Sequence, residues 1–352
     1  MSSGVRTARY HLYYAGMARD AAGTEQIGLA TSTDGVHFER VRGDGLVVAA
    51  DASIEWRGLR VCNPTVLAAS AGYVMFYQGI ARTPPHHTSI GLARSKDGVT
   101  FDCDALPCLS LDDMRGVDSR LDPREHIGLI EPSVVDDDGL YRMWFVYSRG
   151  AYRDGNDLYY ADSQDGCRWS VRARVLSGHQ FGDCRLHYPQ VLKRADDYEL
   201  WFTLKNNRNG MFGIYRMRSE DGRSWGYLTQ VLPRARAGVQ LRRRYVVDLS
   251  LFGRELRASH VVDAVLDRCF PRRFSAGVAH PHLLPGEDGE PDVLYLHGYH
   301  RRRSGEIWMD ISRSEIRGDV VTPPRRVLAT GDTPWDARFV ADPFVLRVPA
   351  SE

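Results

Sequence analysis

Short stretches of alternating apolar and polar residues recur along the whole chain. Runs rich in aromatic residues occupy positions 11–15, 73–78, 141–147, 198–204 and 293–299. In the runs that follow, every second residue is apolar, as with Ile27 and Leu29 or Ile90 and Leu92. A period of two in β-branched and aromatic runs bounded by Gly and Asp is typical of β-strands. The pattern therefore predicts an all-β protein.

Two short motifs accompany these runs. A polar residue, a proline and a β-rich run recur at Asn63-Pro64, Glu131-Pro132, Tyr188-Pro189, His280-Pro281 and Asp342-Pro343. The second motif, Ser-x-Asp-Gly-x-x-aromatic, begins at Ser32, Ser95, Ser163 and Ser219. The proline and the later Asp are 33, 33 and 32 residues apart in the three repeats that carry both motifs. Two motifs held at one interval indicate an internal repeat.

Four antiparallel strands per repeat predict a five-bladed β-propeller. The fifth repeat lacks Asp-Gly, and we expect its turn near Ser314. The first repeat lacks the proline motif, so we expect residues 342–348 to supply its inner strand by pairing beside residues 10–16. This pairing would close the ring and remove an exposed sheet edge. The repeat predicts a single domain over residues 1–352, with an insertion at 226–279 between blades four and five.

Composition limits the classes of partner that the protein is expected to bind. The formal net charge is +1 among 352 residues, so no global field favours nucleic acid or membrane. No apolar run reaches the ~20 residues of a membrane helix, and the N-terminal segment does not look like a secretory signal. The six cysteines follow no metal-ligand spacing. We therefore expect a cytoplasmic protein with reduced thiols, and the oligomeric state stays open.

The residue before each proline is the strongest candidate for chemistry. The inner strands of a propeller converge on its axis, so five side chains, one per blade, should surround one funnel. They are Asn63, Glu131, Tyr188, His280 and Asp342. Proline suits the start of an inner strand, where no ladder N–H is needed. Two carboxyl groups facing each other across a funnel can supply the acid and the carboxylate that glycosidic bond cleavage requires.

With these motifs the chain resembles the five-bladed propeller glycoside hydrolases and phosphorylases, which include arabinanases, xylosidases, invertases, levansucrases and mannoside phosphorylases. The resemblance rests on Ala341 to Val345, on Ile130 to Val134 and on the Ser-x-Asp-Gly turns. It implies that Asp342 is the base or nucleophile and that Glu131 is the general acid. It also implies a second-blade aspartate that tunes the acid, and this chain has Asn63 at that place.

Asparagine can hydrogen-bond a sugar hydroxyl or the acid, but it brings no negative charge to raise a neighbouring pKa. The Asp-Pro strand also ends this sequence, whereas it opens the sequence of the relatives. Ring closure would make the two arrangements spatially equivalent. We further expect burial beside Tyr188 to raise the pKa of one carboxyl group and keep it protonated.

Other candidates are weaker. His187 precedes Tyr188 and could contact a ligand, and Arg124 and His126 lead into the third inner strand. The resemblance allows an axial cation or water beside His280, but a lone histidine is no metal site, so we predict no cofactor. The Asp-Gly turns need only a structural role. The arginine-rich first half of 226–279 is open to two interpretations, a solvated insertion or a clamp for an anionic group.

These observations favour a glycoside hydrolase-like enzyme acting on a small, furanose-bearing glycoside through two carboxylates. One alternative is a phosphate-dependent sugar phosphorylase, whose cationic groups would come from arginines in 234–244 and 301–303. Another is a propeller of specialised metabolism in which the same groups catalyse cyclisation, elimination or transfer. The last is a propeller that binds a sugar without cleaving it, which Asn63 permits.

Overall fold

The computed structural model describes residues 9–20, 23–115, 117, 128–148, 156–182, 184–207, 212–232, 277–287, 289–301, 307–318 and 320–348. In these ranges the chain is all-β, with three single-turn 3-10 helices, η1 (Glu55–Arg57), η2 (Leu111–Met114) and η3 (Gly178–Phe181). Within the same ranges no helix is long and apolar enough to cross a membrane.

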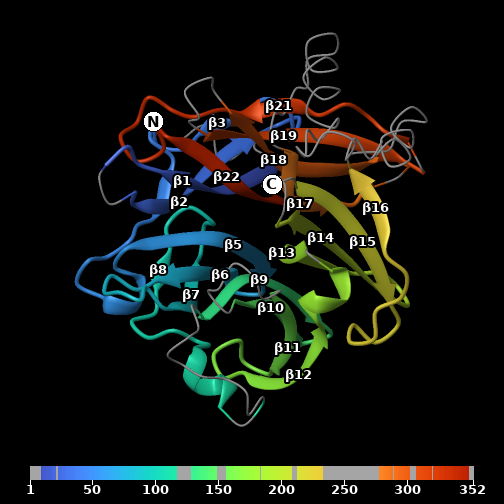
Figure 1. Ribbon diagram of the computed structural model, residues 1–352. Coiled ribbons are helices and arrows are strands. Elements are labelled where there is room, and N and C mark those ends of the chain that lie inside the picture. Colours follow the sequence, from blue (N-terminus) through green and yellow to red (C-terminus); the bar gives the residue numbers. More distant parts are fainter. Residues whose placement is uncertain are drawn as a thin grey trace, which may run out of the picture.

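The strands follow one another as antiparallel neighbours (Figure 1). The first two sets are β1 (Tyr10–Met17), β2 (Glu25–Ser32), β3 (Glu39–Arg40) and β4 (Leu46–Val48), then β5 (Arg60–Ala69), β6 (Gly72–Ile80), β7 (Thr88–Ser95) and β8 (Asp102–Cys103). The next two are β9 (Gly128–Asp137), β10 (Leu140–Ser148), β11 (Asp157–Ser163) and β12 (Ser170–Leu176), then β13 (Cys184–Lys193), β14 (Tyr198–Asn206), β15 (Phe212–Ser219) and β16 (Thr229–Leu232). The last strands are β17 (Gly277–Leu284), β18 (Asp292–Arg301), β19 (Ile307–Arg317), β20 (Val320–Val321), β21 (Arg325–Leu328) and β22 (Phe339–Arg347).

The strands β5, β9, β13, β17 and β22 lie near a common centre, and this gives the fold its propeller-like form (Figure 1). Contacts run from β22 to β5, then to β9, β13 and β17, and from β17 back to β22. The C-terminal strand β22 pairs antiparallel with β1, from Tyr10 opposite Arg347 to Met17 opposite Phe339. Three junctions between neighbouring sets carry a single parallel bridge, such as Glu25 opposite Arg60. The strand sets are therefore separate units that meet mainly through side chains.

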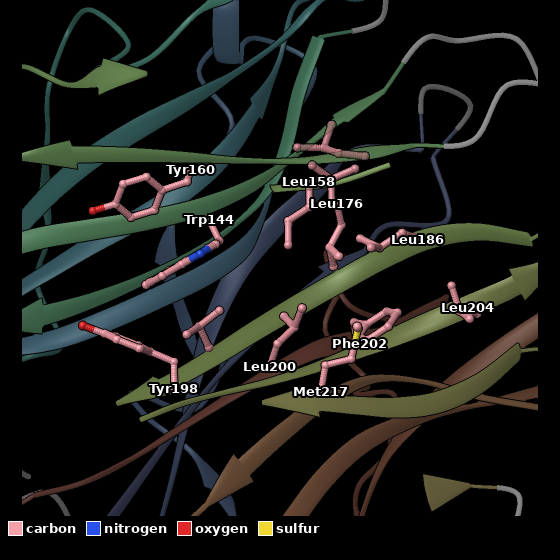
Figure 2. Close-up of a cluster of buried hydrophobic side chains, with 13 residues drawn as sticks. Trp144, Leu158, Tyr160, Leu176, Leu186, Tyr198, Leu200, Phe202, Leu204 and Met217 are labelled. Atoms are coloured by element: carbon pink, nitrogen blue, oxygen red, sulfur yellow. The ribbon is translucent and has the colours of Figure 1, made fainter. Parts of the chain in front are cut away.

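The hydrophobic core lies between neighbouring sets. The cluster in Figure 2 joins Trp144 and Leu158 of one set to Leu186, Leu200 and Phe202 of the next. Another cluster joins Leu12 and Tyr14 near the N-terminus to Leu284, Val293 and Tyr295. Consecutive apolar residues enter different clusters, as Tyr13 and Tyr14 of β1 do, so a strand set is covered on both faces.

Side chains two residues beyond the motif's polar residue tie each inner strand to the next. Thr65 of β5 donates to the carbonyl of Pro132 in β9 at 2.7 Å. Ser133 of β9 accepts from the backbone N–H of Val191 in β13 at 2.8 Å. Gln190 of β13 and His282 of β17 make the matching contacts to Leu283 and Val345. These links replace backbone pairing at the axis, where neighbouring inner strands do not form a ladder.

The prolines do not lie where the sequence predicted. We expected each to follow the first residue of an inner strand, yet Pro64 is in the middle of β5. At this point two residues, Asn63 and Pro64, lie opposite Tyr77 alone, which is a β-bulge. Register shifts at the same place occur in β9, β13, β17 and β22. A bulge leaves a residue out of the ladder, so the missing N–H of proline costs nothing there.

The Ser-x-Asp-Gly turns are structural, as predicted. In all four, the serine hydroxyl accepts from the glycine N–H at 2.9–3.0 Å. The Asp carboxylate accepts from the backbone N–H groups two and three residues further on. Hydrogen bonds from the backbone of Ser224 and Arg223 lower the pKa of Asp221 to about 2. These carboxylates are therefore fully used in shaping the turn.

Three of these turns also hold the preceding strand set. The carbonyl of Gly222 accepts from Trp144 Nε1 at 2.7 Å, and the carbonyls of Gly98 and Gly35 accept from the hydroxyls of Tyr13 and Tyr295. No sequence pattern predicted these contacts between a turn and the neighbouring strand set.

The fifth repeat differs from its prediction. No turn forms near Ser314, because β19 continues to Arg317. Trp201, which is equivalent to Trp144 one set earlier, thus meets no Asp-Gly turn, and its buried Nε1 has no hydrogen-bond partner in the described chain. The expected insertion also begins later than 226, since residues 229–232 form β16 against β15. Residues 233–276, which include the proposed arginine clamp, lie outside the described residues.

Candidate functional site

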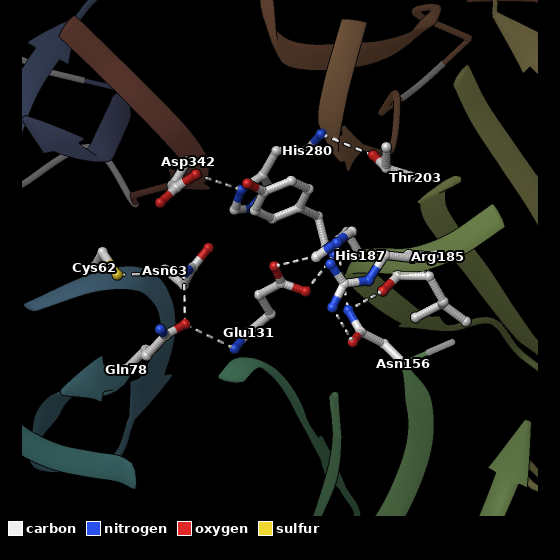
Figure 3. A network of polar contacts seen from close by, with 12 residues as sticks. Cys62, Asn63, Gln78, Glu131, Asn156, Arg185, His187, Thr203, His280 and Asp342 are labelled. Atoms are coloured by element: carbon white, nitrogen blue, oxygen red, sulfur yellow. Dashed lines mark hydrogen bonds and ion pairs between the residues drawn. The ribbon is translucent and has the colours of Figure 1, made fainter. Parts of the chain in front are cut away.

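The five residues that precede the prolines share one unusual backbone conformation. Asn63, Glu131, Tyr188, His280 and Asp342 all have positive φ, between 51° and 57°. This left-handed region is uncommon for residues other than glycine and is found at sites where the surrounding structure fixes it. Here the bulge and the following proline hold the residue, and its side chain turns toward the common centre (Figure 3). The structure therefore brings the five predicted side chains together.

Glu131 is held by the neighbouring inner strand. Its carboxylate accepts from the backbone N–H of Tyr188 at 2.7 Å, and its other oxygen lies 3.0 Å from Nδ1 of His187. The buried Asn156 amide donates to the carbonyl of Leu186 at 3.0 Å and lies 3.3 Å from Nε2 of His187. That orientation makes Nε2 the acceptor, so Nδ1 carries the hydrogen and donates to Glu131. The predicted contact residue His187 is thus an orienting partner of Glu131.

Asp342 has a different environment. Its carboxylate lies 3.0 Å from Nδ1 of His280 and 3.6 Å from Nδ1 of His297. Burial alone would raise the pKa of Asp342, but the hydrogen bond from His280, the charge interactions with both histidines and the backbone N–H of Asn63 lower it. Burial lowers the pKa of His297 to about 3, so this ring is neutral at pH 7. Asp342 is therefore a carboxylate at the axis.

Asn63 lies beside both carboxyl groups (Figure 3). Its Nδ2 donates to Oε1 of Gln78 at 2.8 Å, and the same Gln78 oxygen accepts from the backbone N–H of Glu131 at 3.2 Å. Its Oδ1 is buried and has no hydrogen-bond partner among the described residues. An unpaired buried acceptor costs free energy, and such groups mark places where a ligand or water is missing. Asn63 therefore offers an acceptor to the funnel.

Tyr188 and His280 form an aromatic wall. Their rings stack with centroids 4.7 Å apart and an interplanar angle of 21°. The backbone N–H of His280 donates to Thr203 at 3.0 Å, which fixes the base of the ring. Burial raises the pKa of the Tyr188 hydroxyl well above its ordinary value. This stacked pair gives the floor a flat aromatic surface between polar groups.

The sequence missed Glu25, a third carboxyl group at the site. It begins β2, where no motif marks it. One carboxylate oxygen each from Glu25 and Asp342 and the sulfur of Cys62 lie within 4.8 Å of one another. Burial, followed by the charge of Asp342, raises the pKa of Glu25 to about 8, although Arg60 opposes this shift. The sequence predicted a raised pKa for one carboxyl of the Asp342 and Glu131 pair, but the pKa of Asp342 is lowered and the raised pKa belongs to Glu25.

The axial cation that the resemblance allows would have few protein ligands among the described residues. His280, His297 and Asp342 place three potential ligand atoms within 4.8 Å of one another. However, Nδ1 of His297 already accepts the backbone N–H of Asp342 at 3.2 Å, so its lone pair is occupied. His280 and Asp342 would then be the protein ligands of this group, and water would have to complete the coordination of a cation there.

The space on the axis is narrow. A cavity of about 20 Å³ lies along it, which is room for one water molecule. The four motif residues Asn63, Glu131, Tyr188 and His280 contribute to its wall, together with the prolines that follow and with Phe344. The cavity marks where the axis is open between the inner strands.

Several predicted residues lie outside the described part of the chain. They are Arg124, His126, Arg302, Arg303 and the arginines of 234–244. Arg301 ends β18, and its side chain is not described. Cys103 and Cys108 are free thiols, as are the other described cysteines.

The chain was compared with protein-family models, with curated proteins and with solved structures. No protein-family model matches the chain. Uncharacterized protein Rv1502 of Mycobacterium tuberculosis strain H37Rv is 31% identical over 176 residues, which is 47% of this chain and 53% of that protein. Protein MT1551 of strain CDC 1551 matches to the same extent. The chain thus spans about half the length of the curated relatives it matches.

Solved structures match over most of the chain. A glycosyl hydrolase from Bacteroides ovatus has a TM-score of 0.56 at 14% identity, covering 85% of this chain and 83% of its own. A thermostable family-43 glycoside hydrolase has a TM-score of 0.56 at 16% identity, covering 93% and 92%. A structure from the GH130 family of mannoside phosphorylases and glycoside hydrolases has a TM-score of 0.55 at 15% identity, covering 83% and 80%. At these identities the likeness shows a propeller-like fold.

Proposed function

We propose that this protein is a glycoside hydrolase-like enzyme that acts on a small, furanose-bearing glycoside in the central funnel of a single-domain, five-bladed propeller. In this proposal the pairing of β22 with β1 closes the ring. The observation that carries the proposal is the pair of buried carboxyl groups, Asp342 and Glu131, at equivalent bulges of two inner strands. Acid and base groups on either side of a glycosidic bond are what its cleavage needs.

The two carboxyl groups would have different roles. Asp342 is ionised, so it is the base or nucleophile on one side of the sugar. Glu131 is the general acid, and a proton can reach it through His187, whose side chain is partly exposed and directly hydrogen-bonded to it. Asn63 accepts a sugar hydroxyl through its unpaired Oδ1. Tyr188 and His280 provide the flat surface against which a sugar ring packs.

The fold supports this choice of substrate class. Glycosidases and mannoside phosphorylases are among the solved structures that share the fold. The floor is rich in hydrogen-bond acceptors, which suits a ligand that presents hydroxyl groups.

A phosphate-dependent phosphorylase is the second candidate, and two arginines favour it. Arg60 and Arg185 stand three residues before Asn63 and Tyr188, at the same register position of β5 and β13. Arg60 is close enough to lower the pKa of Glu25. Guanidinium groups at this level would bind orthophosphate.

Turnover assays separate these candidates. We expect nitrophenyl arabinofuranoside or a related nitrophenyl furanoside to be cleaved without phosphate, and Glu131→Gln and Asp342→Asn each to abolish cleavage while circular dichroism stays unchanged. Turnover that requires phosphate and is lost in Arg60→Gln would favour the phosphorylase. Full activity in both carboxyl variants would refute the assignment. Sugar binding by calorimetry without product over long incubation would favour a non-catalytic propeller.

A further inference from the structure

Glu25 lies at the point where β2 of the first strand set meets β5 of the second. Its backbone is opposite Arg60 in the parallel bridge between these strands, and the residue is only 8% exposed. The charged and titratable groups that face it are Asp342 of β22, Cys62 and Arg60 of β5, and Tyr299 of β18. Glu25 therefore shares one buried environment with Asp342.

Two carboxyl groups this close in a buried site cannot both be ionised at low cost. The hydrogen bond from His280 and the backbone N–H of Asn63 favour the charged form of Asp342. Glu25 has no comparable donor among its described partners, and burial raises its pKa to about 8. One proton is therefore held at neutral pH, and it is on Glu25.

The spacing of the two groups is short enough for one oxygen atom to contact both. The closest ligand atoms of the pair lie within 4.8 Å of each other. A single hydroxyl oxygen reaches partners on two sides at about 2.7–2.8 Å each, so it can bridge this separation. A protonated carboxyl donates to that oxygen, and a carboxylate accepts its hydrogen.

A second observation points to a ligand beside Asp342. Oδ1 of Asn63 is buried without a hydrogen-bond partner in the described chain, and Figure 3 shows it directed into the space between Asp342 and Glu131. The Asn63 amide also lies 3.4 Å from the sulfur of Cys62, which belongs to the Glu25 cluster. The floor thus presents one unused acceptor, Oδ1 of Asn63, beside the donor that protonated Glu25 supplies.

We infer that Glu25 and Asp342 form a carboxylic acid–carboxylate pair that binds one hydroxyl group of the ligand, with Glu25 donating to its oxygen and Asp342 accepting its hydrogen. The identity of the ligand as a sugar rests on the proposed function, whereas the proton-sharing pair does not. Glu25 is thus a third carboxyl group at the site, besides Asp342 and Glu131. Asn63, at the place where the resemblance implies an aspartate, provides no carboxyl group.

Infrared difference spectroscopy tests the pair without any ligand. The wild type, Glu25→Gln and the control Glu39→Gln, which changes an exposed residue of β3, would be compared from pH 6 to pH 10. We expect the wild type and the control to lose one protonated-carboxyl band over this range, and Glu25→Gln to lack it throughout. In Asp342→Asn, which removes the neighbouring charge, the band should disappear at a lower pH. Identical carboxyl bands in the wild type and Glu25→Gln would overturn the inference.

Calorimetry tests the hydroxyl-binding part. Methyl arabinofuranoside and methyl mannoside would be titrated into the wild type and Glu25→Gln at pH 7 and pH 9.5. We expect the wild-type affinity for at least one of them to fall about tenfold at the higher pH, as Glu25 loses its donor hydrogen. Glu25→Gln keeps a donor and should bind equally at both values. Absence of binding, or wild-type binding that is equal at both pH values, would overturn this part. Failure of the turnover assays with a positive infrared result would refute the proposed function alone.

Discussion

The outer turns and the inner bulges repeat in opposite ways. At the turns, Ser, Asp and Gly recur because their side chains and backbone make the turn themselves, as the four matching sets of hydrogen bonds show. At the bulges, the backbone recurs with φ between 51° and 57°, while the residue that adopts it changes from set to set. Sheet pairing and proline hold the bulge, so the side chain is free for chemistry. A repeated motif therefore marks structure where its residues are constant and marks the site where they vary.

The largest expected effect is on turnover, and it tests the bulge residues, which vary from set to set. Glu131→Gln and Asp342→Asn should each lower turnover by about 10²–10⁴-fold or more, because each removes a group that transfers a proton or stabilises charge. Circular dichroism and urea unfolding should show that both variants stay folded. The control is Asp221→Asn, which alters a turn carboxylate and should leave turnover unchanged. Equal losses of turnover in all three would remove the distinction between bulges and turns.

The next effect is on the free energy of unfolding, and it tests the residues of the Ser-x-Asp-Gly turns, which are the same in each set. Gly222 has φ of +72°, and a Cβ there would lie 2.7 Å from Cζ2 of Trp144. Gly222→Ala should therefore lower the free energy of unfolding by about 2–4 kcal/mol, from backbone strain and overpacking together.

Gly139→Ala is the matched control for Gly222→Ala. Its φ is +85°, but nothing lies within 4 Å of its Cβ position. Only the backbone cost of about 1–2 kcal/mol should remain. Equal losses in urea unfolding would show that the contact with Trp144 adds nothing.

The pH dependence of stability tests Glu25. Its pKa in the folded protein, about 8, is above the ordinary value of 4.5. The stability linked to its proton is thus fully present below pH 4.5 and is lost as the pH rises through 8. Between pH 5 and pH 9 the wild type should lose about 1–4 kcal/mol more unfolding free energy than Glu25→Gln. Parallel curves for the two proteins, from urea titrations, would show that Glu25 is not protonated.

The smallest effect compares two tryptophans at equivalent positions. Trp144→Phe removes the hydrogen bond from Nε1 to the carbonyl of Gly222 and should cost about 1–2 kcal/mol beyond the change in packing. Trp201→Phe removes a buried N–H that has no described partner, so its cost should be smaller by about that amount. Urea unfolding of both variants measures the difference. A larger loss of unfolding free energy for Trp201→Phe would contradict the absence of a hydrogen-bond partner for Trp201 Nε1 in the described chain.

Much of the fold and the site could be predicted from the sequence because both are written as repeats. Alternation gave the strands, and the proline motif identified the five side chains that converge. Tertiary structure decided what local patterns do not contain. It placed Pro64 at a bulge in the middle of β5, continued β19 past Ser314 and brought His187 onto Glu131. No motif marks Glu25, because its role depends on burial beside Asp342, more than 300 residues away in the chain. Residue order determined which groups repeat, and packing around the axis determined that a residue outside the repeat, Glu25, keeps a proton.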